Sequence, residues 1–132
     1  MTLVVPNVGE QSALNKLLNQ NLTLKLFSNN ITPGETDTAA SYTEVSGGGY
    51  ASKPLTFANW TVTPGAPTAA LYNAAQDFSF TGATGAPSTI YGYYIVDGSN
   101  VLILAERFAP AVVPFTPIAG SLIRITPRIE AS

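Results

Sequence analysis

The sequence contains neither cysteine nor histidine. Without cysteine, disulfide bonds and thiolate metal sites are excluded, so the fold depends on core packing or on neighbouring subunits. Without histidine, the chain lacks the most common general base, the most common metal ligand and the usual pH-sensitive side chain. A Ser-His-Asp triad is impossible, and we expect a protein that is not an enzyme and needs no metal or other cofactor.

Charge is also scarce, at 11% of residues against roughly 25% in an ordinary soluble domain. The net charge is −2, and the six lysines and arginines are scattered along the chain. Nucleic-acid binding requires clustered basic residues, so we expect no nucleic-acid partner. The low charge indicates a surface that a protein partner covers, although a neutral, threonine-rich β-domain that stands alone has the same composition.

Long hydrophobic runs are missing as well. No stretch approaches the roughly 20 apolar residues that span a bilayer, and the first seven residues lack the basic region of a signal peptide. We therefore expect no membrane partner and no secretion.

The 132 residues, 45% of them hydrophobic, are enough for one domain with a real core. Residues 1–8 are expected to form an arm in which Pro6 fixes a kink. A helix of about three turns is expected from Gly9 to Asn19, because its apolar residues recur at helical spacing. Residues 1–20 are thus an arm with a short helix, and residues 21–132 a single β-domain. The apolar residues of this helix are Ala13, Leu14, Leu17 and Leu18.

After the helix the period changes to two. Leu22, Leu24 and Leu26 alternate with other residues, which predicts a half-buried strand. The segments Thr89–Val96 and Val101–Phe108 flank a hairpin turn and are apolar on both faces. Such strands are central in a sandwich or are covered by a partner.

About eight short strands, separated by Gly- and Pro-rich turns, predict a mainly β fold. We expect an antiparallel β-sandwich or jelly-roll-like domain with one short N-terminal helix. The other expected strands are Tyr42–Val45, Lys53–Phe57, Trp60–Thr63, Thr68–Tyr72, Asp77–Thr81 and Ser121–Thr126. The segment Asn29–Ser41 is expected to be a long loop, and Gly47–Gly49 a flexible turn.

Few residues suggest chemistry. Glu35, Asp37 and Glu44 provide at most half of a calcium site, and a solvated acidic loop is the favoured explanation. Tyr91, Tyr93 and Tyr94, with Trp60, are compatible with a carbohydrate- or peptide-binding surface or with core packing.

Several sequence segments resemble a family of small virion structural proteins of tailed bacteriophages, of the capsid decoration or cement kind. They are Val5–Glu10, Leu22–Pro33, Tyr42–Glu44, Ile90–Tyr94, Ala105–Phe108 and Ile123–Ser132, and the match runs from residue 4 to the end.

The resemblance implies a protein of the virion, located on the capsid surface, with the major capsid protein as partner and with self-association as a dimer or trimer. The arm and helix would supply the contacts, by adding a strand to an exposed edge or by placing apolar anchors in a groove. A tail, baseplate or fibre-associated subunit and a carbohydrate-binding module are the alternatives. The expected interface residues are Leu3, Val4, Val5, Pro6, Leu14, Leu17, Tyr91 and Tyr93.

Overall fold

The computed structural model describes residues 3–131 as one helix and antiparallel β-sheets. This confirms the mainly β fold with a short N-terminal helix. The elements are α1 (Asn7–Leu18), β1 (Leu22–Phe27), β2 (Lys53–Leu55), β3 (Trp60–Thr63), β4 (Thr68–Tyr72), β5 (Gln76–Ser79), β6 (Gly92–Val96), β7 (Leu102–Arg107), β8 (Leu122–Ile125) and β9 (Arg128–Ala131), with short 3-10 turns η1 (Ala39–Ser41) and η2 (Phe57–Asn59).

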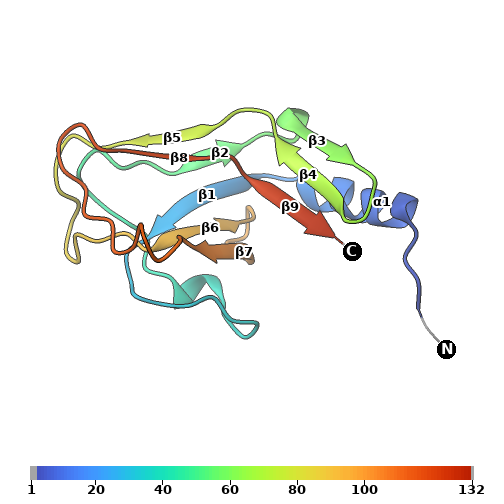
Figure 1. Cartoon of the computed structure of the whole chain (residues 1–132), viewed down its shortest axis with the longest axis horizontal. Helices are drawn as coiled ribbons and strands as arrows, with labels where there is room; N and C mark the ends of the chain where they lie inside the picture. The colour runs from blue at the N-terminus through green and yellow to red at the C-terminus, as the bar shows by residue number, and fades with distance from the viewer. Residues whose placement is uncertain (1–2, 132) are drawn as a thin grey trace.

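The strands form two layers (Figure 1). One layer is a four-stranded sheet in the order β2-β1-β6-β7. The other consists of the sheet β3-β4-β9 and the pair β5-β8, which continue one another because β4 leads into β5 and β8 leads into β9. The N–H of Tyr72 donates to the carbonyl of Pro127 at 2.9 Å, between the two pairings.

The main core fills the space between the layers. Leu22, Leu24 and Leu26 of β1 are at most 1% exposed, as their period-two spacing predicts. They share one cluster with Phe78 and Ile123 of the opposite layer.

Strand β6 is buried on both faces. Its Ile95 points into the main core, whereas Tyr94 belongs to a second cluster with Phe27 and Tyr42. Tyr42 ends the segment 28–42, so this chain's own loop covers the outer face of the sheet. Strand β6 is thus apolar on both faces because it is central in its sheet and because the segment 28–42 packs on its outer face. This pattern does not require a partner subunit.

The helix is packed against β3 and β4. Leu14 and Leu18 are 4% and 0% exposed and belong to the main core. The Thr68 hydroxyl, itself fully buried, donates a 2.7 Å hydrogen bond to the Glu10 carboxylate. The two polar groups can be buried because each one satisfies the hydrogen-bonding requirement of the other.

Some local expectations were wrong. The helix begins at Asn7 rather than Gly9, because the Pro6 carbonyl accepts hydrogen bonds from the N–H groups of Gly9 and Glu10. The expected strand 42–45 is a single bridge between Phe27 and Glu44. Strand β9 was not anticipated, because its alternation of charged and apolar residues is only four residues long.

The glycines at 47–49 do more than provide flexibility. All three have positive φ, of 74°, 61° and 80°, which disfavours any L-residue with a side chain. A Cβ at Gly48 would lie 2.7 Å from the carbonyl oxygen of Gly82, and the Thr81 N–H donates to the Gly48 carbonyl at 2.9 Å. The glycine run therefore lies in close contact with the loop around residues 81–85, and only glycine fits there.

Candidate protein-binding surfaces

The arm before α1 is apolar and exposed. Leu3, Val4 and Val5 are 89%, 75% and 51% exposed, and Pro6, in an extended conformation, is exposed too. Figure 1 shows the arm leaving the domain beyond the helix and pointing away from both layers. A contiguous run of exposed apolar residues is a candidate interaction site.

The two helix residues of the expected interface lie differently. Leu14 is committed to the core of its own chain and offers almost no surface to a partner. Leu17 is half-buried, and its carbonyl accepts a 2.7 Å hydrogen bond from the Gln20 amide. The structure thus places Leu14 and Leu17 apart from the exposed arm.

The aromatic residues do not form an open binding face. Trp60, Tyr93 and Tyr94 are 8%, 8% and 3% exposed, and Tyr94 lies in a different cluster from the other two. The Tyr93 hydroxyl donates to the Glu106 carboxylate at 3.3 Å. A sugar ring stacks on an accessible aromatic face, and these residues provide none.

Tyr91 is half-buried and lies under a guanidinium group. The Cζ atom of Arg107 is 5.0 Å from the ring centroid, and Nη1 donates to the Asn30 side chain at 2.8 Å and to the Ile31 carbonyl at 3.0 Å. Arg107 therefore ties the loop 28–42 to the edge strand β7. No local sequence pattern indicates this contact, because the partners are more than 75 residues apart.

We expect Arg107→Ala to loosen that loop. The substitution removes two hydrogen bonds from a charged donor and the cation–π contact, so a loss of about 1–3 kcal/mol in unfolding free energy is expected. Hydrogen exchange should accelerate at residues 29–41. Arg128→Ala is the control, because that guanidinium bonds only the exposed Glu130 carboxylate among the described residues. Equal exchange in both variants would contradict the role of Arg107.

The acidic residues Asp37 and Glu44 make separate sets of contacts and do not form a joint site. Asp37 accepts hydrogen bonds from the Tyr42 hydroxyl at 2.7 Å and from the Gly34 N–H at 2.9 Å. Glu44 accepts from the Tyr50 hydroxyl at 2.8 Å and pairs with Lys25 at 3.5 Å. Within residues 3–131 no group of three possible ligands is placed to hold a metal ion.

Burial raises the pKa of several tyrosines. The pKa of Tyr42, Tyr93 and Tyr94 rises to about 12, first because their hydroxyls are removed from water and further because Asp37, Glu106 and Glu44, respectively, are nearby negative charges. The pKa of Tyr50 is raised for the same leading reason. These hydroxyls remain protonated in the folded protein at a pH where free tyrosine ionises.

This arrangement predicts alkaline unfolding. In the unfolded chain tyrosine ionises near pH 10, so the stability is intact below about pH 10 and is lost as the pH rises toward 12. Each tyrosine with a pKa near 12 is expected to contribute a loss of at most about 1–2 kcal/mol at pH 12, because solvent screens part of the effect. Denaturant titrations across this range, with tyrosinate absorbance recorded in parallel, measure it. A constant unfolding free energy up to pH 12 would rule the explanation out.

A groove of about 320 Å³ opens between the end of β7 and strand β8. Glu106 and Arg124 are among its lining residues, and Arg124 also donates a hydrogen bond to Asp77 at 2.7 Å. Sequence patterns did not indicate the groove, because its walls come from two segments, 106–115 and 122–124, that only the fold brings together. Its apolar lining includes Phe108, Val112, Phe115, Leu122 and Ile123.

Both strands beside the groove are edge strands. Strand β7 ends the order β2-β1-β6-β7, and β8 has only β5 as a neighbour. Main-chain N–H and C=O groups on their outer sides therefore lack a strand partner among the described residues. Natural proteins usually shorten, charge or cover such edges, whereas β7 is six residues long and begins Leu102-Ile103-Leu104-Ala105.

The chain matches no protein-family model, no curated protein and no solved structure. None of the helices in the described part of the chain is long and apolar enough to span a membrane.

Proposed function

We propose that the protein is a structural subunit of a tailed-bacteriophage virion, and specifically a capsid decoration protein that binds and stabilises the outside of the head shell. The observation that carries a binding role is the exposed, uncharged arm Leu3–Pro6, which stands clear of a well-packed β-domain. The assignment to a phage particle, and to the major capsid protein as partner, rests on the sequence resemblance.

The composition supports an assembly role. With 11% charged residues, little of the surface is strongly hydrated, so contacts with neighbours require less desolvation of charge. The helix that holds the arm is fixed to β3 and β4, so the arm starts from a rigid base. Repetition of weak contacts around a shell would then hold each copy through avidity.

Cosedimentation tests the proposal. Purified protein is mixed with empty phage heads and, separately, with purified tails. Saturable binding to heads at a fixed stoichiometry is the expected result. Binding to tails alone would place the protein in the tail, baseplate or fibre, and binding to neither particle would overturn the virion assignment.

The arm is tested separately by deleting residues 2–5. This deletion leaves Pro6, which accepts the first hydrogen bonds of α1, and leaves Leu14 and Leu18 in the core. We expect a folded protein that binds heads more weakly. Unchanged affinity for heads would show that attachment does not involve the arm.

A further inference from the structure

The arm and the groove each present apolar surface that no other residue between 3 and 131 covers. Leu3, Val4 and Val5 are at least 51% exposed, while Val112 and Leu122 at the groove are 48% and 49% exposed. Burial of such surface in water is favourable by roughly 25 cal/mol per Å². Binding of the arm in an apolar groove, and of an apolar segment in this groove, is therefore favourable.

The shape of the arm suits the groove. The arm is extended at Pro6, and in an extended segment alternate side chains point to the same side. Leu3 and Val5 would then enter the groove together while Val4 faces the other way. An extended segment lying there would also run beside β7 and β8, whose outer main-chain groups can accept an added strand.

The charges of the two surfaces are compatible. Residues 1–9 carry no charged side chain. The groove is lined by one acid and one base: Glu106 accepts a hydrogen bond from the Tyr93 hydroxyl, and Arg124 forms an ion pair with Asp77. An uncharged apolar segment that binds there adds no further charge to the site.

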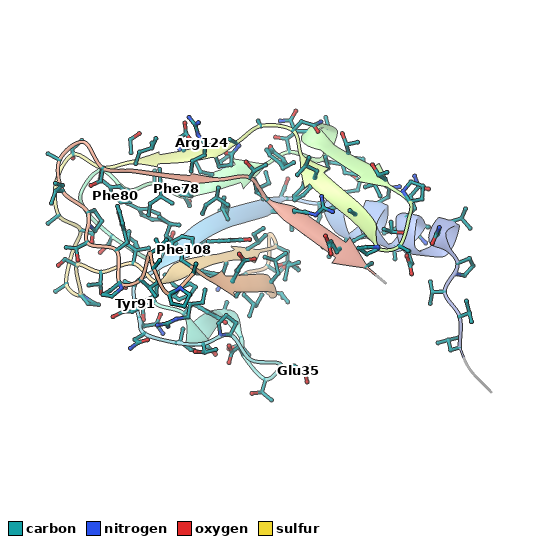
Figure 2. All side chains as sticks on the ribbon, viewed as in Figure 1. Glu35, Phe78, Phe80, Tyr91, Phe108 and Arg124 are labelled. Atoms are coloured by element: carbon teal, nitrogen blue, oxygen red, sulfur yellow. The ribbon has the colours of Figure 1, made fainter. Side chains whose placement is uncertain are left out.

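The arm and groove of one chain lie far apart along the long axis of the molecule. Figure 1 shows the arm beyond α1 at one end, and Figure 2 shows Phe108, which lines the groove, in the opposite half of the domain. The arm also points away from the domain. The groove of a second copy is therefore the host available to it.

We propose that the arm residues Leu3–Pro6 of one copy bind in the groove between β7 and β8 of a second copy. The contact joins two different surfaces of the protein. Repeated between copies, it forms a reciprocal dimer or a closed ring if the geometry closes, and an open chain of copies if it does not. The inference rests on the proposed function and refines it: the direct partner of the arm is another copy of this protein, and the linked copies bind the head more tightly through avidity.

Light scattering after size-exclusion chromatography of the full chain, over a range of concentrations, tests the proposal. Wild type is expected to self-associate. The arm variant Leu3→Asp/Val5→Asp and the groove variant Val112→Asp/Leu122→Asp should each weaken association at least about thirtyfold, the effect of losing contacts that contribute about 2 kcal/mol. Thermal unfolding confirms that each variant is folded, as expected for exposed positions.

Val101→Asp is the matched control, because Val101 is 55% exposed but lies in the β6–β7 turn, away from both surfaces. It should associate like wild type. Val4→Asp should weaken association less than Leu3→Asp, since its side chain faces away from the groove.

Mixing the two defective variants gives the sharpest result. The groove variant retains a normal arm and the arm variant retains a normal groove, so the mixture should form a 1:1 complex although neither variant associates alone. A wild type that stays monomeric up to millimolar concentration, or a mixture that forms no complex, would overturn the proposal.

These results are separable from head binding. Protein that coats heads but shows no arm-dependent self-association keeps the proposed function and refutes the arm exchange. Protein that self-associates through the arm but binds neither heads nor tails keeps the exchange and refutes the virion assignment.

Discussion

Gly92→Ala is expected to prevent stable folding. Gly92 opens β6, the strand held between β1 and β7, and its Cα is paired with Phe27 on one side and Arg107 on the other. A Cβ there would overlap the carbonyl oxygen of Glu106 and lie 2.6 Å from Cζ of the Phe27 ring. Because one obstacle is main chain and the Phe27 ring is fully buried, neither can move aside cheaply.

We expect the loss to be about 3 kcal/mol or more, at or above the upper end for overpacked cores. Soluble yield and urea unfolding measure it. Gly82→Ala is the control, since a Cβ at Gly82 meets nothing within 4 Å. Similar stability of the two variants would show that β6 and β7 can separate to admit a methyl group.

Leu18→Ala is expected to have the second large effect. Leu18 is the last residue of α1, is 0% exposed and belongs to the main core. Removing a buried leucine side chain leaves a cavity and costs about 2–5 kcal/mol. The expected result is a large fall in the urea midpoint with an unchanged slope.

The control on the same helix is Val8→Ala, because Val8 is 73% exposed. It should change stability by less than about 0.5 kcal/mol. If Leu18→Ala were as mild as Val8→Ala, the helix would be a detachable appendage, and removal of residues 1–19 would be harmless. We expect instead that this removal destabilises the whole domain, which is why the test of the arm deletes residues 2–5 alone.

The exchange of the arm would also protect the protein from its own edges. A long apolar edge such as Leu102–Ala105 is a template for uncontrolled strand pairing. An arm bound in the groove at the Glu106 end of this strand would limit such pairing with a segment of defined length. Variants that lose the arm are therefore expected to be less soluble as well as less associated.

The sequence by itself determined the local structure where one pattern dominates. The alternation of Leu22, Leu24 and Leu26 places β1, and the helical spacing around Leu14 and Leu18 places α1. The turn Asp97–Asn100 joins β6 to β7, where Asp97 accepts hydrogen bonds from two main-chain N–H groups and Asn100 has a φ of 61°. These signals are local, because a period or a turn depends on residues close in the chain.

Only the tertiary structure decided what covers each surface. Apolar residues on both faces of β6 fit a partner or an internal cover equally, and the cover is the loop ending at Tyr42. Likewise Leu14 and Leu3 are both apolar N-terminal residues, yet one is 4% and the other 89% exposed. Burial depends on contacts between segments distant in the sequence, such as Glu10 with Thr68, and no local pattern encodes those pairings.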